Sequence, residues 1–424
     1  MSIYSTKRIL AQGELMSNDT WQTGINNNDL IIGPSGAGKT RGYVMPNILQ
    51  CNESMVIADT KGSLYGQFAP LLRKRGYRVM NIDFSDTLAS EGYNPLNYIR
   101  FDRRRRKFVE QDIMTLSAAI IPRTDTREPF WDESARMLLS ALVGYVLEVL
   151  PQKEHTLEYV VRLFSAMDGS TPPKPLYHDL FQELVKEKPD SFAARQYQLY
   201  SRLQGADRTD ACVQSFLARA LSPMAFDGPV HMYNCPSQVN FRDLGREKTA
   251  VFLTVSDTDR SMDSLASLFY TQALNSLCHS ADKDYEDHRL PVPVRFILDD
   301  FATNVRIPDF EKVISVIRSR EIYVSIILQS ISQLESVYTH GDSMTIINNC
   351  DNCLYLGGQD VETARYIAAK ANRTADSILN MPLGSAYLFT RGQKPRIVKK
   401  YDVRFHGAYA EMEQAKESTS ELAF

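Results

Sequence analysis

The chain has 424 residues, 43% of them hydrophobic and 23% charged, which is typical of a globular protein rather than a fibrous or disordered one. A formal net charge of −3 excludes a basic field over the whole molecule, so any contact with nucleic acid has to be local. Six cysteines in a chain of this length do not form a disulfide framework. The longest uncharged apolar run, Met137 to Leu147, is far shorter than the ~20 residues of a membrane-spanning helix, so we expect a cytosolic chain.

The first elements alternate between strands and helices. After a polar, irregular lead (Met1–Asp29), the apolar residues Leu30–Ile32 predict a strand, and a glycine-rich loop follows it. A helix is expected from Thr40, shortened or kinked by Pro46. Further strands are expected at Ser54–Thr60 and Tyr77–Asp83. This alternation predicts a mainly parallel sheet with helices on both faces.

The middle of the chain has a different pattern. From Phe101 to Asp227 apolar residues recur three and four positions apart, and strand signals are scarce, so we expect an inserted all-α domain there. Strands then return at Thr249–Ser256, Val294–Ala302, Val324–Ser330 and Cys353–Gly358, with a closing antiparallel hairpin built from "SAYLFTRG" and "RIVKKYDV". The expected division is a discontinuous α/β domain (1–100 and 228–407), a helical domain (101–227) and a flexible tail (408–424).

The loop after the first strand carries the clearest chemistry. Residues 33–40 match G-x-x-x-x-G-K-[ST], and strand and helix flank them as this phosphate-binding motif requires. Backbone N–H groups of such a loop approach phosphate oxygens, Lys39 is expected to reach the β- and γ-phosphates, and the hydroxyl of Thr40 is expected to bind Mg²⁺. We therefore predict an ATP site formed by Gly33, Pro34, Ser35, Gly36, Ala37, Gly38, Lys39 and Thr40.

The strand "FILDD" provides the second half of the predicted site. An apolar strand that ends in acids can hold a carboxylate beside the magnesium of a phosphate loop. We assign Asp299 to the metal and Asp300 to the attacking water, which it would orient or deprotonate. Gln329 ends the next strand, where it could sense the γ-phosphate or the water, or could simply cap the strand end.

Two groups of basic residues each have two possible roles that the sequence alone does not separate. Arg318 and Arg320 precede the expected strand Val324–Ser330, and they lie too far along the chain from the phosphate loop to act in the site of their own subunit. They could act across a subunit boundary as an arginine finger, or be solvated charges. The basic run "FDRRRRKF" (Phe101–Phe108) could contact DNA or acidic lipid, although most such runs are solvated helix faces.

Cys350 and Cys353 form the only C-x-x-C motif. A zinc site needs about four ligands, and no second pair is near them in the sequence. A redox pair is one interpretation, and two buried cysteines beside a strand is the favoured one.

Together these segments resemble type IV coupling proteins, the TraG/TraD-type ATPases of conjugation and type IV secretion. The resemblance rests on the phosphate loop, "VIADTKGSLYGQF", "EPFWDESARMLLSALVGYV", and "ILDDFATNVRIPDFEKVISVIRSREIYVSIILQSISQL", and it extends from Thr23 to Asp402. It implies a RecA-like P-loop motor that forms a ring hexamer. The resemblance also implies that its all-α domain meets single-stranded DNA, the relaxase–DNA complex and the secretion machinery. Gly33, Gly38, Lys39 and Thr40 fall on the family's phosphate loop, Asp299 on its metal-binding acid, Gln329 on its strand-end glutamine, and Arg318 on its trans-acting arginine.

The chain departs from the family pattern in two ways. The family usually has Glu where Asp300 stands, and the shorter side chain changes the reach to the attacking water, which could slow hydrolysis. The family also usually begins with membrane-spanning helices, and this sequence begins just before the motor. We expect a location at the cytosolic face of the bacterial inner membrane, reached through a partner or through an anchor missing from this chain.

Three other functions would also use a phosphate loop. A nucleotide-dependent adaptor, which collects cargo with little hydrolysis, is favoured slightly by Asp300 and by the missing anchor. A chromosome-segregation translocase is disfavoured by the inserted helical domain. A small-molecule kinase is disfavoured because it would normally be shorter, with a lid and a substrate pocket.

Overall fold

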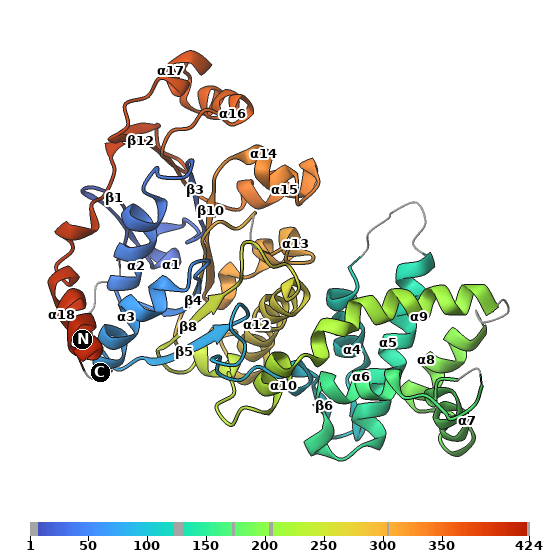
Figure 1. Cartoon of the computed structure of the whole chain (residues 1–424). Coiled ribbons are helices and arrows are strands. Elements are labelled where there is room, and N and C mark those ends of the chain that lie inside the picture. Colours follow the sequence, from blue (N-terminus) through green and yellow to red (C-terminus); the bar gives the residue numbers. More distant parts are fainter. Residues whose placement is uncertain (1–6, 123–129, 172–173, 203–206, 303–304, 422–424) are drawn as a thin grey trace. The chain divides into compact units, whose positions relative to one another are not determined.

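The computed structural model describes residues 7–122, 130–171, 174–202, 207–302 and 305–421, so the first six and last three residues of the predicted lead and tail lie outside the described part (Figure 1). These residues form two compact units. Unit 1 comprises residues 1–85, 240–258 and 273–424, and unit 2 comprises residues 86–239 and 259–272. The boundaries differ from the expected 101–227 because residues 86–100 and 228–239 on its two sides, and residues 259–272 with the first part of α12 (Asp263–Asp284), pack with the helical unit.

A nine-stranded sheet is the centre of unit 1, with the strand order β13-β12-β11-β3-β10-β9-β4-β8-β5. The pairings from β11 to β5 are parallel, and β12 and β13 form an antiparallel edge, so the predicted RecA-like α/β fold and the closing hairpin are confirmed. The strands are β3 (Asp29–Ile32), β4 (Ser54–Ala58), β5 (Arg78–Asp83), β8 (Thr249–Thr254), β9 (Val294–Leu298), β10 (Ile322–Leu328), β11 (Asn352–Tyr355), β12 (Ser385–Thr390) and β13 (Arg396–Lys399).

Helices cover both faces of this sheet (Figure 1). One face packs against α2, α3 and α18, and its core includes Ile48, Phe68 and Met412, each fully buried. The helices of unit 1 are α1 (Thr20–Thr23), the π-helical η1 (Thr40–Val44), α2 (Met45–Leu49), α3 (Ser63–Lys74), α11 (Phe241–Leu244), α12 (Asp263–Asp284, in this unit from Ala273), α13 (Phe310–Val316), η6 (Arg318–Arg320), α14 (Ile331–Glu335), α15 (His340–Asn348), α16 (Val361–Ala371), α17 (Ala375–Leu379), η7 (Val403–Phe405) and α18 (Tyr409–Glu421).

Both ends of the chain have more structure than expected. The lead, predicted to be irregular, contains the antiparallel hairpin β1 (Lys7–Ala11) and β2 (Glu14–Ser17). The tail, predicted to be flexible, contains α18, which packs on α3 through the buried Met412 and through ion pairs of Glu411 with Lys74 and Arg75. The strands of the hairpin are only five and four residues long, and α18 is mostly polar, so the hydrophobic signal of each element in the sequence is weak.

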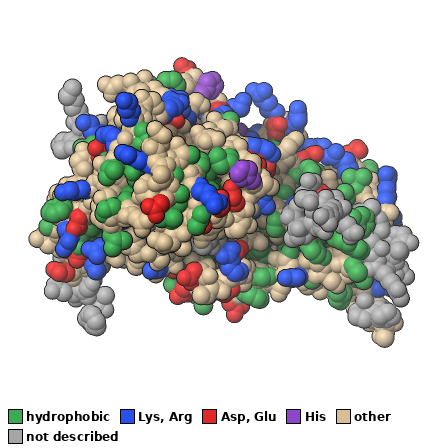
Figure 2. All heavy atoms as spheres, turned by 90° about the horizontal axis from the view of Figure 1, so that it is seen from above, with side chains coloured by type: hydrophobic (Ala, Val, Ile, Leu, Met, Phe, Trp, Pro, Cys, Tyr) green, Lys and Arg blue, Asp and Glu red, His purple; other side chains and the backbone are tan. Residues whose placement is uncertain are grey.

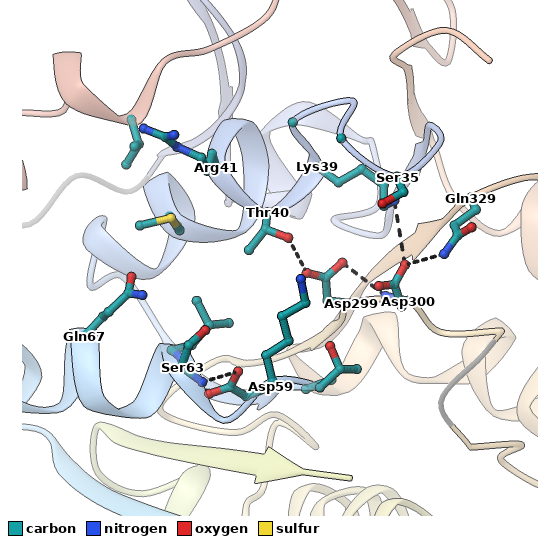
Figure 3. A pocket seen from close by; sticks show the side chains of 18 of the residues that line it. Ser35, Lys39, Thr40, Arg41, Asp59, Ser63, Gln67, Asp299, Asp300 and Gln329 are labelled. Carbon is teal, nitrogen blue, oxygen red and sulfur yellow. Dashed lines mark hydrogen bonds and ion pairs between the residues drawn. The ribbon is translucent and has the colours of Figure 1, made fainter. Parts of the chain in front are cut away.

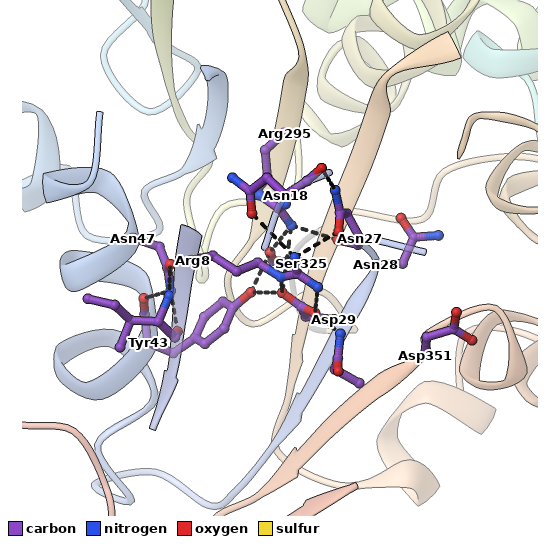
Figure 4. Close-up of polar contacts among 12 residues, drawn as sticks. Arg8, Asn18, Asn27, Asn28, Asp29, Tyr43, Asn47, Arg295, Ser325 and Asp351 are labelled. Atoms are coloured by element: carbon purple, nitrogen blue, oxygen red, sulfur yellow. Dashed lines mark hydrogen bonds and ion pairs between the residues drawn. The ribbon is translucent and has the colours of Figure 1, made fainter. Parts of the chain in front are cut away.

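A buried polar cluster fixes the N-terminal hairpin to the sheet (Figure 4). Arg8, only 1% exposed, makes two ionic hydrogen bonds to Asp29 at the start of β3, with N–O distances of 2.7 and 3.1 Å. The hydroxyl of Tyr43 donates to the same carboxylate at 2.6 Å. Arg295, equally buried, forms an ion pair with Glu53 and donates to the carbonyl of Asn27. These contacts bring β1, β3 and β9 together at the amino ends of the strands.

Unit 2 is mainly helical, as predicted for the inserted segment. Its central helix, α5, packs on α4, α6, α8 and α9. Gly144 on α5 lies so close to α8 that an added Cβ would be 3.2 Å from the Cα of Ala193. Glu148 accepts hydrogen bonds from the first N–H groups of α8 and so caps it. The helices are α4 (Glu110–Ile120), α5 (Phe130–Val149), η3 (Gln152–Glu154), α6 (Leu157–Ser165), α7 (Tyr177–Glu187), α8 (Phe192–Ser201), α9 (Asp207–Leu221), η5 (Ser222–Ala225) and α10 (Asp227–Asn234), with η2 (Pro95–Tyr98) before them.

The basic run does not form a helix face. Phe101–Asp102 (β6) and Lys107–Phe108 (β7) pair as a short antiparallel hairpin, and the four exposed arginines 103–106 form its turn. Asp102 accepts hydrogen bonds from the N–H groups of Arg104 and Arg105 and so stabilises the turn, a role that helical periodicity alone does not reveal.

The cysteine pair is buried beside a strand, which confirms the favoured interpretation. Cys350 precedes β11 and Cys353 lies in it, and both thiols are free. Burial raises the pKa of both thiols, which keeps them protonated and unreactive near neutral pH. Among the described residues, no helix is long and apolar enough to cross a bilayer.

Candidate nucleotide-binding site

The phosphate loop follows β3 and lies at the carboxyl ends of the parallel strands. Gly36 and Gly38 have φ angles of +76° and +91°, which side chains other than glycine rarely adopt. The N–H of Gly33 donates to the carbonyl of Leu328 at 3.0 Å, so the loop starts beside the end of β10. Thr40 then opens the π-helical turn that leads into α2. The loop therefore has the strand–loop–helix setting that its sequence predicts.

Lys39 lies under the loop and is only 7% exposed. Its ammonium donates to the carbonyl oxygens of Gly33 and Pro34, at 3.0 and 3.3 Å, and lies 3.7 Å from the carboxylate of Asp300. A buried cation held in this way is placed to meet the terminal phosphates of a nucleotide.

Thr40 and Asp299 meet directly at the end of β9. The Thr40 hydroxyl donates to the Asp299 carboxylate at 2.7 Å (Figure 3). Asp299 is 6% exposed, and burial raises the pKa of its carboxyl group. A hydroxyl and a carboxylate are oxygen ligands of the type that Mg²⁺ prefers, so this pair fits a magnesium ion.

Asp300 has a backbone conformation unusual for its residue type, with φ at +48°. Its N–H donates to the side chain of Asp299 at 3.1 Å. Its carboxylate accepts a hydrogen bond of 3.4 Å from the amide of Gln329, which follows β10. The structure thus brings Lys39, Asp300 and Gln329 together from the carboxyl ends of β3, β9 and β10.

These groups line a pocket of about 540 Å³. The acids and Gln329 lie at one end of it, and Arg41 and Gln67 lie at the other (Figure 3). Other lining residues were not predicted from the sequence because they lie outside the phosphate loop and the two strand ends, in η1, α2, the segment from β4 into α3, and the C-terminal segment. They are Arg41, Met45, Ala58, Asp59, Thr60, Lys61, Ser63, Leu64, Gln67, Val403, Tyr409, Glu413 and Lys416.

Among the lining residues that were not predicted from the sequence, Asp59 accepts three backbone hydrogen bonds from the start of α3. It follows β4 and accepts hydrogen bonds from the N–H groups of Ser63, Leu64 and Tyr65, at 3.1, 2.6 and 3.0 Å, so it caps the first turn of α3. Its position after a buried strand, at the same sheet edge as Asp299, was the available signal.

A family model described as "Type IV secretory system Conjugative DNA transfer" matches residues 2–376. The chain belongs to this family. VirD4 of Agrobacterium fabrum (strain C58 / ATCC 33970) is 24% identical over 351 residues, covering 80% of this chain and 49% of that protein. A conjugal transfer protein TraG of Escherichia coli is 24% identical over 365 residues, covering 81% of this chain and 55% of that protein. The chain thus spans about half the length of these curated relatives.

Solved structures of a coupling protein have the same fold. The plasmid coupling protein TrwB in complex with ADP and Mg²⁺ superimposes with a TM-score of 0.69 at 16% identity, covering 94% of this chain and 89% of that chain. TrwB with the ATP analogue ADPNP gives a TM-score of 0.68 at 17% identity, covering 94% of this chain and 90% of that chain. The similarity confirms the predicted RecA-like fold of this coupling-family chain.

The two arginines of η6 lie away from this pocket. They precede the first residue of β10, whereas the phosphate loop meets its last residue, and seven extended residues span roughly 20 Å. Arg320 forms an ion pair with Asp282 at 2.8 Å, so it has a local structural role. Arg318 donates to the carbonyl of Thr20 at 3.4 Å. The structure therefore does not bring Arg318 into the site of its own chain.

Proposed function

We propose that this chain is an ATP-hydrolysing coupling protein, which recruits and moves DNA, or relaxase-linked DNA, into a type IV secretion machine. The observation that carries the proposal is the meeting of Lys39, the Thr40–Asp299 pair and Asp300 at one sheet edge. Family membership supports the transport role, and the nucleotide complexes of the structurally similar TrwB support ATP as the ligand.

In this mechanism the loop's N–H groups hold the α- and β-phosphates, and Lys39 turns from its loop carbonyls to the β- and γ-phosphates. Thr40 and Asp299 would hold Mg²⁺, which supplies positive charge to the phosphate oxygens when bound. Asp300 takes a proton from water as the water oxygen attacks the γ-phosphorus. The bond from the γ-phosphorus to the bridging oxygen then breaks, and ADP and phosphate leave. Gln329 orients Asp300 or the water.

The assembly is part of the same proposal. Arg318 would act on the nucleotide of a neighbouring subunit in a ring, with a hexamer as the expected size. Partners would be single-stranded DNA, a relaxase–DNA complex and secretion components, at the cytosolic face of the inner membrane through a partner or a further anchor. On the face drawn in Figure 2, Lys and Arg are scattered among acidic side chains, so this view identifies no DNA-binding surface.

ATP turnover of the purified protein, with and without single-stranded DNA, tests the proposal. Turnover that rises with DNA and is lost in Lys39→Ala is the expected result. Tight ATP binding without turnover, with or without DNA, would contradict the motor role and favour the nucleotide-dependent adaptor. The short side chain of Asp300 is the specific observation that keeps this second function open.

A further inference from the structure

The C-terminal segment forms one wall of the nucleotide pocket. Val403 in η7 and Tyr409, Glu413 and Lys416 on α18 all line it. The family match covers residues 2–376 and does not include this wall. We propose that this segment is the subsite for the nucleoside, with Tyr409 holding the base and Glu413 the ribose. The inference deepens the function proposed above and rests on it.

The polarity of the phosphate loop places the nucleoside at this end of the pocket. Lys39 meets the β- and γ-phosphates, and it lies beside Asp300. The γ-phosphate end is therefore the end with Asp300 and Gln329. Arg41, one residue past the loop, lies at the opposite end together with Gln67 (Figure 3). The C-terminal wall belongs to that end, because α18 packs on α3, which carries Gln67, and Asp402 lies close enough to Arg41 to feel its charge. A nucleotide that enters with its γ-phosphate at Asp300 must direct its ribose and base toward that opposite end.

The wall is a built part of unit 1. Met412 is fully buried, and Tyr409 packs against the same core cluster. On the next face of the helix, Glu411 forms ion pairs with Lys74 at 3.2 Å and with Arg75. Because Tyr409 is already held by this packing, its side chain loses little conformational entropy when a ligand binds.

The side chains of the wall suit a nucleoside. Tyr409 supplies an aromatic ring to the pocket lining, a group on which a base can stack, and the apolar Val403 lies on the same wall. Glu413 offers carboxylate oxygens that can accept hydrogen bonds from ribose hydroxyls, as acids do in dinucleotide sites. Lys416, also on α18, brings a cation to a ligand that carries several negative charges.

The test compares a nucleotide with its phosphate part alone. Binding of Mg–ADP and of inorganic tripolyphosphate is measured by calorimetry for the wild type, Tyr409→Ala, Tyr409→Phe and Phe405→Ala. Phe405 is the matched control, because it is an aromatic residue of the same segment, is 74% exposed and does not line the pocket. Tyr409→Ala should weaken ADP binding about tenfold and leave tripolyphosphate binding unchanged. Tyr409→Phe and Phe405→Ala should match the wild type.

A second variant covers the case that Tyr409→Ala does not fold. Glu413→Gln should weaken binding of ADP and leave binding of its 2′,3′-dideoxy analogue unchanged. Equal loss of ADP and tripolyphosphate in Tyr409→Ala, or no loss of either, would overturn the inference. If the wild type bound tripolyphosphate and not ADP, the nucleoside subsite would be wrong while a phosphate site stood. If the wild type bound neither ADP nor tripolyphosphate, the result would contradict the proposed function itself, and not only the nucleoside subsite.

Discussion

At the residue scale, the proposed hydrolysis depends most on one carboxylate, that of Asp300. Asp300 is held between Lys39 and Gln329, at 3.7 and 3.4 Å, on a backbone with positive φ. The coupling family usually has the longer Glu at this position. Whether the shorter acid meets the attacking water therefore depends on this local geometry, since small displacements of a catalytic group cost rate steeply.

Two substitutions at this position separate charge from reach. Asp300→Asn removes the base and should lower ATP turnover about 100-fold or more, with ADP affinity unchanged. Asp300→Glu keeps the charge and extends it by one methylene, so turnover should equal or exceed that of the wild type. Steady-state kinetics with calorimetric binding measures both, and a fully active Asp300→Asn would remove Asp300 from the chemistry.

The buried ion cluster gives a residue-scale prediction for stability. Arg8→Ala leaves the Asp29 carboxylate buried without its main cation, so the free energy of unfolding should fall by roughly 3–5 kcal/mol. Arg396→Ala removes the exposed pair with Glu14 and should cost less than about 1 kcal/mol. Denaturant unfolding measures both. Equal losses would mean that the cluster does not anchor the N-terminal hairpin.

At the scale of elements, His406 stabilises the start of α18 through two hydrogen bonds, and its pKa lies well below the usual value. His406 accepts a hydrogen bond from the N–H of Ala408 at its Nδ1, so its Nε2 carries the proton and donates to Gln50. Burial, and secondly the charge of Arg75, lowers the pKa of His406 to about 4. The neutral ring therefore belongs to the folded state.

Acid should loosen this helix. Because the folded pKa lies below the usual 6.5, the unfolded chain binds more protons between these values, and stability falls as pH drops from 6.5 toward 4. The hydrogen bond from Arg75 lowers the pKa of Glu411, so acid weakens its ion pairs less than it would those of an ordinary glutamate. Hydrogen exchange of α18 amides should accelerate there relative to α3. The acceleration should be absent in His406→Asn, and its persistence would assign the effect to another group.

The arginine turn of β6–β7 is the element-scale test of DNA contact. If the exposed arginines 103–106 meet phosphates, their replacement by alanine should weaken single-stranded DNA binding. The slope of log affinity against log salt should fall by about 0.7 for each lost contact. Arg365→Ala, an exposed arginine on α16, is the control. An unchanged slope would identify the turn as a solvated surface feature.

At the scale of the whole molecule, the proposed ring needs two subunits for each active site. Arg318→Ala and Lys39→Ala should each remove most of the ATP turnover, by about 10³-fold for the arginine. In the proposed ring, Lys39 binds the nucleotide of its own subunit and Arg318 acts on the nucleotide of the neighbouring subunit, so each active site needs both residues. Mixed subunits of the two variants should regain part of the activity, since some interfaces then contain both intact residues. Mixtures as inactive as the variants alone would exclude the trans role of Arg318.

The sequence by itself determined the sheet and the phosphate end of the site. Each predicted strand of the sheet was found, because buried parallel strands are continuous apolar runs and the glycine-rich loop is a local pattern. Asp299 and Gln329 could be placed beside Lys39 because the carboxyl ends of parallel strands meet at one edge. These signals need only a few neighbouring residues.

Only the tertiary structure decided the features that join distant parts of the chain. Arg8 meets Asp29 through a hairpin of two short strands, and Tyr409 lines a pocket whose loop begins at Gly33. The turn at Arg103–Arg106 likewise depends on the pairing of two short strands. Such contacts arise from packing and charge pairing between segments far apart in sequence, and local periodicity carries no information about them.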